Sequence, residues 1–190
     1  DTAEMVKTNV LGTINVMEAA EDAGVDRVVL VSSDKAYAPV NAYGASKLMA
    51  EKLVLTGSDL RGGRRPIYAV CRYGNVAGST GSVIPTWRRM AEQAQYVQVT
   101  DPDATRFWMG RDHAVSLVLD CARTMMGGET CIPDLPAFRV GDLATAMGLR
   151  HIVVGMTARE KMHESMDATR CSATARRMSV AELREALEHV

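Results

Sequence analysis

The chain has 190 residues, of which 47% are hydrophobic, and a formal net charge of −1. These values suit one domain with a sizeable core and a small appendage, and the balanced charge excludes the basic field that nucleic acid would require. No window approaches about 18 apolar residues and no charged-then-apolar signal sequence opens the chain, so we expect a soluble, cytoplasmic protein without membrane contact.

The first predicted element is a helix over residues 2–23, because Val6, Val10, Ile14 and Met17 recur at helical spacing. A dinucleotide-binding fold normally places a strand and a G-x-G-x-x-G or G-x-x-G-x-x-G turn before its first helix. No such turn occurs anywhere in the sequence.

A short, buried strand is predicted for residues 27–33, which read RVVLVSS. Its last residues are Ser32 and Ser33, and Asp34 and Lys35 follow directly. A hydroxyl pair at the end of a strand can polarise a substrate oxygen. The strand is therefore expected to present a group of reactive polar side chains at its carboxyl end.

A turn through Pro39 and Asn41 leads into a predicted helix over residues 41–56, followed by an exposed loop over residues 57–65. Tyr43 and Lys47 are four residues apart on this helix, so the ammonium can lie beside the phenol and favour its ionised form. Such a tyrosine can act as a base near neutral pH. Taken alone, the pair also suits an ordinary solvated helix face.

A second buried strand is predicted for residues 66–72, and a glycine-rich stretch over residues 73–85 follows it. Glycines at positions 74, 78 and 81 would let backbone amides approach a ligand closely, and an ordinary strand-to-helix loop is the alternative. A short helix over residues 87–95 and an alternating strand over residues 96–100 come next.

Residues 105–115 read TRFWMGRDHAV. Arg106 offers a cation for a diphosphate, while Phe107 and Trp108 either offer a flat surface for a base or belong to the core. Asp112 is expected to cap a helix that runs to residue 123. The residues predicted to face inward on this helix are Val115, Val118 and Leu119.

The remaining elements are short, as is typical of a substrate-capping subdomain. They are extended pieces over residues 129–133 and 136–140, a helix over 142–149 and a strand over 151–155. Ser179 and Glu182 fit a capping box at the start of a final helix. The cysteines at positions 71, 121, 131 and 171 lack Cys-x-x-Cys spacing, so we expect reduced thiols, no disulfide framework and no metal ligands.

The motif S-S-D-K-A-x-x-P-x-N-x-Y-G-A-S-K, residues 32–47, resembles that of the extended short-chain dehydrogenase/reductases. More narrowly, it is similar to that of the inverting UDP-N-acetylglucosamine 4,6-dehydratases of polysaccharide biosynthesis. The stretches over residues 72–85 and 105–115 resemble the same family, except that Thr80 stands where relatives usually carry arginine. This departure removes one cationic contact for the substrate.

The resemblance implies an α/β fold with a Rossmann-like doubly wound parallel sheet that lacks its N-terminal glycine-rich part. Residues 1–133 would form the core, and residues 134–190 would form most of a small cap to which residues 82–109 contribute. Because the match begins well inside a full family member, the chain is expected to be either a piece of a longer polypeptide or a shortened protein.

The resemblance also implies the site residues. The catalytic set would be Ser33, Asp34, Lys35, Tyr43 and Lys47. The cofactor, NADP or NAD, would contact Asn9, Ser32, Tyr43, Lys47, Tyr73, Gly74, Asn75 and Val76. A UDP-sugar partner would contact Asn75, Ser82, Val83, Arg106, Glu160 and His163. A metal pair of His163 with a neighbouring glutamate lacks the ligand count that zinc needs.

The implied reaction converts UDP-N-acetylglucosamine to a 4-keto-6-deoxy sugar with inversion at C5, for surface polysaccharide or glycan biosynthesis. Tyr43 would take the proton of the C4 hydroxyl with Lys47 beside it, and Ser33 would bond the C4 oxygen. Lys35 would be the C5 base and Asp34 the acid that assists loss of the C6 hydroxyl.

Without the dinucleotide-binding half, the protein is expected to be inactive or incomplete. One alternative is a non-catalytic shortened homologue that binds a UDP-sugar or only self-associates. Another is a nucleotide-sugar epimerase or reductase, which is disfavoured because Asp34 and Lys35 have no task in simple C4 epimerisation. Helices 2–23 and 41–56 are expected to form a homodimer interface.

Overall fold

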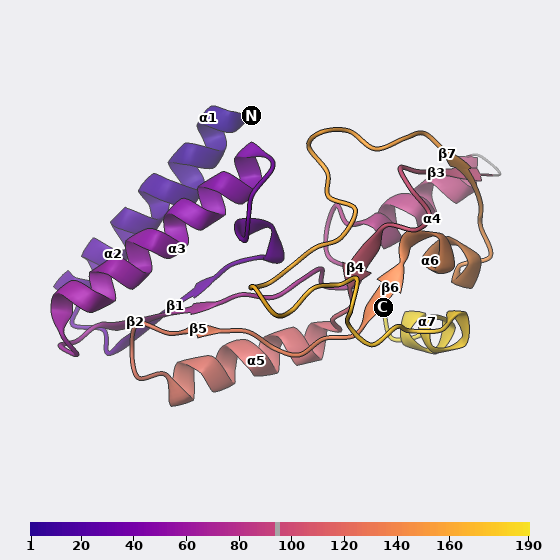
Figure 1. Ribbon diagram of the computed structural model, residues 1–190. Coiled ribbons are helices and arrows are strands. Elements are labelled where there is room, and N and C mark those ends of the chain that lie inside the picture. Colours follow the sequence, from indigo (N-terminus) through magenta and orange to yellow (C-terminus); the bar gives the residue numbers. More distant parts are fainter. Residues whose placement is uncertain (94–95) are drawn as a thin grey trace. The chain divides into compact units, whose positions relative to one another are not determined.

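The computed structural model describes residues 1–93 and 96–190. The chain divides into two compact units (Figure 1). Unit 1 comprises residues 1–73 and 115–133, and unit 2 comprises residues 74–114 and 134–190. No helix in the described part of the chain is long and apolar enough to cross a membrane.

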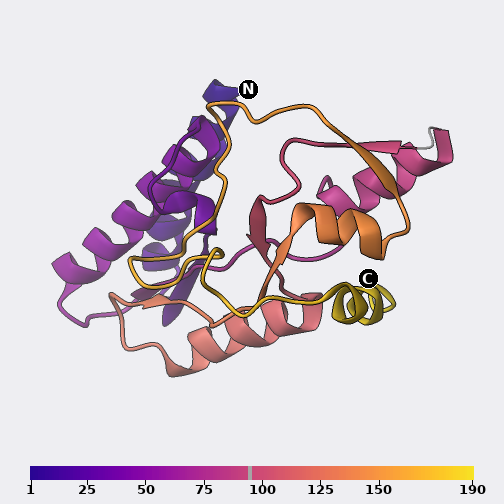
Figure 2. The same ribbon diagram turned by 45° about the vertical axis from the view of Figure 1, so that its right-hand side comes forward.

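Unit 1 contains a parallel sheet in the strand order β1-β2-β5. Its strands are β1 (Arg27–Val31), β2 (Ile67–Cys71) and β5 (Thr130–Cys131). Its helical segments are α1 (Thr2–Met5), η1 (Val6–Leu11), α2 (Gly12–Asp22), η2 (Asp34–Ala36) and α3 (Ala42–Arg61), together with most of α5 (Arg111–Thr124). In Figures 1 and 2, α2 and α3 lie on one face of this sheet and α5 lies on the other.

Both faces of β2 are covered, which explains why its sequence is continuously apolar. Alternate residues of a strand point to opposite faces. Tyr68 and Val70 pack with Val54 of α3, while Ala69 and Cys71 pack with residues of α5. The predicted parallel α/β arrangement is therefore confirmed for unit 1.

The first helical segment runs from residue 2 to residue 22, close to the prediction, but its middle part is a π-helix. The Thr13 hydroxyl donates to the Asn9 carbonyl at 2.7 Å, a side-chain bond that competes with the regular backbone ladder. Asn9 therefore lies in an irregular turn, and such turns are frequent at functional sites.

Helix α3 begins as predicted, because Asn41 Oδ1 accepts the Gly44 N–H at 2.9 Å. The prediction of a loop over residues 57–65 was wrong for residues 57–61, which continue α3. The helix ends at Gly62, whose backbone is left-handed. Gly57 does not end the helix because it packs against Met17 of α2, where a larger side chain would press on the methionine.

Unit 2 contains two small sheets. Strands β3 (Tyr96–Val99) and β7 (Arg150–Val153) are parallel, and β4 (Thr105–Phe107) and β6 (Ala137–Arg139) are antiparallel. Its helices are α4 (Val83–Gln93), α6 (Val140–Ala146) and α7 (Val180–Leu187), with the first turn of α5. These elements share a core that includes Trp87, Val97, Trp108, Phe138, Leu143 and Leu183.

The aromatic residues of β4 and its end belong to this core. Phe107 and Trp108 are buried, and Trp108 meets the edge of Phe138 with ring centroids 5.7 Å apart. Phe107 and Trp108 therefore belong to the core, which is one of the two positions predicted for them.

Three predicted helix starts need correction. Helix α4 begins at Val83, not at residue 87, because Pro85 is tolerated in a first turn. Residues 94 and 95 of the predicted helix lie outside the described residues. Helix α5 begins at Arg111, so Asp112 lies in its first turn and does not cap it. Helix α6 begins at Val140, two residues before the predicted start.

The inward face of α5 also differs from the prediction. Val118 packs against the sheet as predicted, but Leu117 packs beside it, and Val115 and Leu119, predicted to face inward, are exposed. The reason is helical periodicity: the buried Cys121 fixes the inward stripe, and positions three and four residues earlier share it.

Candidate functional site

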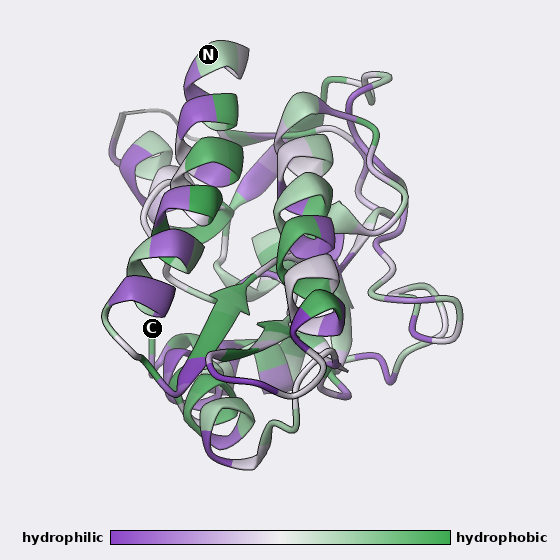
Figure 3. Ribbon diagram, turned by 90° about the vertical axis from the view of Figure 1, so that its left-hand side faces the viewer, coloured by the Kyte–Doolittle hydropathy of each residue, from purple (hydrophilic) through white to green (hydrophobic). Residues whose placement is uncertain are grey.

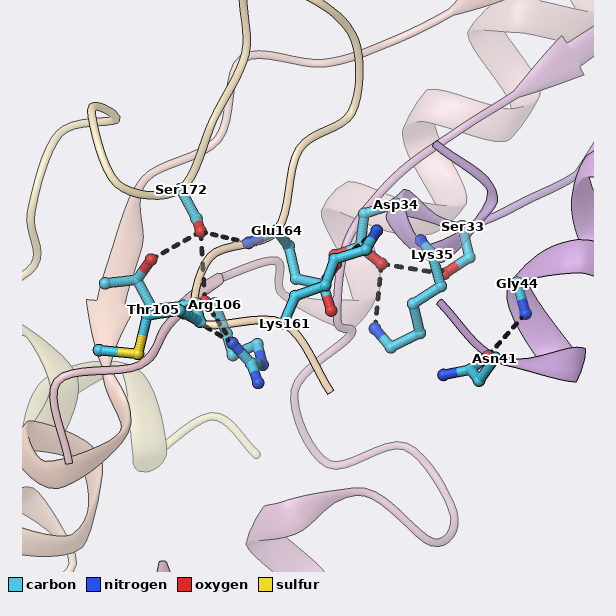
Figure 4. A network of polar contacts seen from close by, with 11 residues as sticks. Ser33, Asp34, Lys35, Asn41, Gly44, Thr105, Arg106, Lys161, Glu164 and Ser172 are labelled. Atoms are coloured by element: carbon cyan, nitrogen blue, oxygen red, sulfur yellow. Dashed lines mark hydrogen bonds and ion pairs between the residues drawn. The ribbon is translucent and has the colours of Figure 1, made fainter. Parts of the chain in front are cut away.

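The polar residues at the end of β1 form one connected cluster (Figure 4). Asp34 is fully buried, and its Oδ1 accepts the Ser33 hydroxyl and the Lys35 ammonium, each at 3.0 Å. The Asp34 N–H donates to the Tyr73 carbonyl at 3.0 Å, which ties the cluster to the end of β2. The structure therefore brings three of the predicted catalytic residues into direct contact.

Lys47 reaches the same strand end from α3. Its Nζ donates to the Val31 carbonyl at 2.6 Å, immediately before the two serines. Burial lowers the pKa of Lys47, and the negative charge of Glu51 works in the opposite direction. A lysine in this position is held beside the strand end as a partly desolvated cation.

Tyr43 lies one turn before Lys47 on α3 and is 38% exposed, so its ring is accessible. Its neighbour is Tyr73: burial raises the pKa of the Tyr73 phenol, and the nearby Cys71 and Tyr43 raise it further. The Tyr43 carbonyl accepts the Ser46 hydroxyl at 2.8 Å, and Ser46 in turn accepts the Asn9 amide at 3.0 Å. Asn9 is thereby linked to the turn of α3 that carries Tyr43.

A buried ion pair supports this region, and sequence reasoning did not find it. Glu51 is 1% exposed and its carboxylate binds the Arg72 guanidinium through Nε, at 2.9 Å, and through Nη2. Arg72 also lies over the Tyr37 ring, 6.0 Å from its centroid. The sequence did hold a sign of this pair: an arginine directly follows a buried strand, and a cation in such a place needs an acidic partner.

Two buried polar atoms of the cluster call for a ligand. Ser32 Oγ and Asp34 Oδ2 have no hydrogen-bond partner among the described residues. Buried polar atoms in proteins are normally hydrogen-bonded. Lys47 donates to the carbonyl of the residue just before Ser32, so these two atoms and a cation lie at the same strand end.

The outer edge of β1 is open in the part of the chain that the structure describes, because β1 pairs only with β2. A groove of about 320 Å³ runs between this strand and the η1–α2 segment. Its lining includes Asn9, Val28, Leu30 and Lys47. An unpaired strand edge presents backbone N–H and C=O groups with which another strand can pair.

Unit 2 contains the other predicted residues, Gly74, Asn75, Val76, Ser82, Val83, Arg106, Glu160 and His163. His163 belongs to a hydrogen-bond network with β4, of which Figure 4 shows the Thr105, Ser172 and Glu164 members. Thr105 Oγ1 lies 2.8 Å from His163 Nδ1 and 2.7 Å from the Ser172 hydroxyl, which also accepts the Glu164 N–H at 2.9 Å. Through His163, the chain segment that contains this residue is hydrogen-bonded to β4.

Glu160 makes local contacts, whereas Arg106 also donates from Nη1 to the distant Met162 carbonyl at 3.3 Å. Arg106 Nη1 donates to the Thr105 carbonyl at 2.7 Å, and the side chain is only partly buried. The Glu160 carboxylate accepts the Thr157 N–H and hydroxyl, each at 3.2 Å. This bond builds the turn that the sequence Thr157-Ala158-Arg159 forms.

The glycine-rich stretch is held in place by β4 and its end. Val76 forms a bridge with Met109, and the Ala77 N–H donates to the Met109 carbonyl at 2.8 Å. Gly78 has a φ of +72° and packs against Val190, so its small size is needed for packing within unit 2. Ser82 Oγ is buried without a hydrogen-bond partner in the described chain, which makes it the residue of this stretch best suited to a ligand.

The sequence is similar to that of known nucleotide-sugar enzymes. The sequence matches the family described as polysaccharide biosynthesis protein over residues 1–182. It is 41% identical over 166 residues to the UDP-N-acetylglucosamine 4,6-dehydratase (inverting) of Campylobacter jejuni, covering 86% of this chain and 50% of that protein. It is 37% identical over 169 residues to the UDP-glucose 4-epimerase of Rickettsia typhi, again with 86% and 50% coverage. The chain spans about half the length of these curated relatives.

Solved structures agree on the fold. The crystal structure of Pen from Bacillus thuringiensis matches with a TM-score of 0.89 and 30% identity, over 97% of this chain and 69% of that one. The dTDP-glucose 4,6-dehydratase DesIV of Streptomyces venezuelae, solved with NAD bound, matches with a TM-score of 0.77 and 20% identity, over 99% and 67% of the two chains.

Proposed function

Because the chain belongs to the polysaccharide biosynthesis protein family, we propose that it is the catalytic and substrate-binding part of a UDP-sugar 4,6-dehydratase. The observation that carries the proposal is the buried contact of Asp34 with Ser33 and Lys35 at the end of β1. A carboxylate and an amine in direct contact provide an acid and a base for the elimination of water from a sugar.

The Asp34–Lys35 contact explains how both roles can be served at once. Transfer of one proton from the Lys35 ammonium to Asp34 Oδ1 leaves a neutral amine and a carboxylic acid. The amine can then remove the C5 proton of a 4-keto sugar, and the acid can protonate the departing C6 hydroxyl. Asp34 is fully buried and its Oδ1 lies 3.0 Å from the Lys35 Nζ, so a proton has a short path between the two groups.

The other residues at the strand end would act on the C4 oxygen. Tyr43 takes the proton of the C4 hydroxyl, Ser33 bonds the oxygen, and Lys47 stabilises the ionised phenol. When bound, a nicotinamide cofactor, NADP or NAD, would supply the hydride-transfer chemistry that oxidation at C4 and reduction at C6 require. Ser32, Lys47 and Asn9 are the residues of unit 1 proposed to hold it.

Unit 2 is proposed to bind the UDP-sugar and serve as its cap. Arg106 offers a cation to the diphosphate, and the unpartnered Ser82 hydroxyl offers a hydrogen bond. Thr80 is exposed and neutral where related sequences carry arginine, so Arg106 carries more of the phosphate binding.

The dinucleotide-binding part is proposed to pack on the open edge of β1. The groove along this edge contains Lys47 and Asn9, so a strand placed there would meet both cofactor-binding residues. The relatives are about twice as long as the matched region, which leaves length for such a part.

The test supplies a dinucleotide-binding half in trans. The protein is mixed with the N-terminal half of the Campylobacter jejuni relative, NADP⁺ and UDP-N-acetylglucosamine in D₂O, and the sugar is followed by NMR. We expect deuterium at C5 and a new C6 methyl group. Lys35→Ala should abolish both signals, while Lys52→Ala, exposed on α3, should retain them.

Each other result would decide against the proposal. Equal turnover by Lys35→Ala would remove Lys35 as the base. Interconversion of the C4 epimers without deuterium at C5 would identify an epimerase. Binding of the UDP-sugar without turnover in any mixture would indicate a non-catalytic homologue, and absence of binding would overturn the assignment altogether.

A further inference from the structure

Three of the four cysteines, although far apart in sequence, meet in the core of unit 1. Cys71 ends β2, and Cys131 ends β5 directly beside it in the parallel register. Cys121 approaches both from α5, and its Sγ lies 2.9 Å from the Sγ of Cys131. All of these cysteines are free thiols.

We propose that Cys121 and Cys131 form a reversible disulfide bond when the protein meets a hydroperoxide. A disulfide has an S–S length of about 2.05 Å, so the two sulfur atoms need to approach by less than about 1 Å. The cluster is not arranged as a metal site, since no group of three or more His, Cys, Asp or Glu residues in the described chain could hold an ion.

The exposure of the three thiols sets the order of the reaction. Cys131 is partly exposed, whereas Cys71 and Cys121 are buried. Burial raises the pKa of Cys71 to about 11 and also raises the pKa of Cys121, so both remain thiols at neutral pH. Cys131 is therefore the thiol that a peroxide in solution reaches first.

The chemistry proceeds in two balanced steps. The Cys131 sulfur attacks the peroxide, the O–O bond breaks, and an alcohol or water leaves, which oxidises Cys131 to a sulfenic acid. The Cys121 sulfur then attacks the Cys131 sulfur, the S–O bond breaks, and water leaves with the Cys121 proton. Two thiols are oxidised by two electrons and the hydroperoxide is reduced. A dithiol reverses the bond.

The bond would lie next to the strand ends that carry the polar cluster. The Cys71 carbonyl accepts the Ser32 N–H at 2.8 Å, and the Cys131 carbonyl accepts the Arg72 N–H at 2.9 Å. Oxidation would therefore fasten α5 to β5 at the residue whose carbonyl binds the Arg72 N–H. This inference does not depend on the proposed dehydratase function.

The experiment treats the folded protein with a small alkyl hydroperoxide, blocks the remaining thiols under denaturing conditions and maps the peptides by mass spectrometry. We expect a peptide pair joined through Cys121 and Cys131, lighter by two hydrogen atoms, with Cys171 blocked as a free thiol. Dithiothreitol should restore the original mass. The oxidised protein should also show a higher midpoint of thermal unfolding.

Cys121→Ser and Cys171→Ser are the matched variants. Cys121→Ser should leave Cys131 as a sulfenic acid that dimedone traps, and Cys171→Ser should form the bond as the wild type does. Random pairing that includes Cys171, a bond only between two molecules, or further oxidation of wild-type Cys131 without a bond would overturn the proposal. Peptide mapping of the wild type decides the matter even if Cys121→Ser fails to fold.

Discussion

At the scale of single residues, the contact between Glu51 and Arg72 joins α3 to the end of β2. Arg72 follows β2 directly, and its N–H and guanidinium bind β5 and α3 respectively. An isolated charge in this position would be desolvated without compensation. The ion pair therefore joins two elements of unit 1 close to the polar cluster.

Removing the carboxylate should be costly for this reason. We expect Glu51→Ala to lower the free energy of unfolding by about 3–5 kcal/mol, because the Arg72 guanidinium, only 12% exposed, loses its carboxylate partner. Urea unfolding measures the change. The control is Glu4→Ala, whose partner Lys7 lies 3.8 Å away on an exposed surface, and its cost should stay below about 1 kcal/mol. Similar losses for the two variants would contradict the interpretation.

At the scale of elements, two glycines on α3 have opposite surroundings. A Cβ atom on Gly44 would collide with the Lys35 carbonyl and lie 2.9 Å from Pro39 Cβ, both in the segment that follows β1. A Cβ atom on Gly57 would meet only the end of the Met17 side chain, which can rotate away. Gly44 thus lets the segment that carries Asp34 and Lys35 pack closely on α3.

The two glycines give a matched pair of variants. Gly44→Ala should destabilise the protein by about 1–3 kcal/mol, because backbone must move. Gly57→Ala should stay within about 1 kcal/mol of the wild type, since alanine's better helix propensity offsets the shift of Met17. Thermal unfolding of both variants checks this. A loss for Gly57→Ala as large as that for Gly44→Ala would show that Met17 cannot adjust.

Helix α7 is stabilised at its start by the predicted capping box, which the structure confirms. The Ser179 N–H and hydroxyl and the Arg176 guanidinium hold the pKa of Glu182 at about 2, below its ordinary value of 4.5. A carboxyl group with a lowered folded-state pKa stabilises the fold fully above its unfolded pKa. This contribution is lost as the pH falls from about 4.5 to about 2.

The pH dependence can be isolated with Glu182→Gln. Its free energy of unfolding should lie below that of the wild type at pH 6, and the gap should narrow as the pH falls through this window. Denaturation at a series of pH values measures the gap. Glu185→Gln, exposed on the same helix, is the control. A gap that stays constant with pH would mean that the lost stability does not come from the charge of Glu182.

At the scale of the whole molecule, helices α2 and α3 present apolar side chains to solvent. Figure 3 looks onto these helices and shows hydrophobic and hydrophilic residues mixed along both. Leu11, Val16, Met49 and Leu60 are all exposed, and Leu60 reaches 78%. Exposed apolar side chains in such numbers suit an interface between two proteins.

We therefore predict a homodimer through the helical segment 2–22 and α3. Light scattering should give twice the chain mass of 20.6 kDa. The double variant Leu11→Glu with Met49→Glu should be monomeric, because charges cannot be buried in an apolar interface. Met126→Glu, at an exposed site outside these helices, should remain dimeric. A monomeric wild type would refute the prediction.

The sequence by itself determined the features that depend on neighbours a few residues apart. These include the strand that runs up to the two serines, the Asn41 and Ser179 caps, and the motifs that identify the family. The predicted burial of this strand is wrong for the described chain, where Arg27 and Val31 are exposed because β1 pairs only with β2. Local sequence suffices there because caps and strand ends are formed by adjacent backbone and side chains. Which of the predicted site residues act in a reaction stays a prediction.

Only the tertiary structure decided the features that join distant positions. The Glu51–Arg72 pair, the meeting of Cys121 with Cys131, the continuation of α3 past Gly57 and the inward face of α5 are examples. Each depends on which side chain a neighbouring element brings to the same place. Spacing along a chain cannot reveal that choice, because it is made by packing between elements that are remote in sequence.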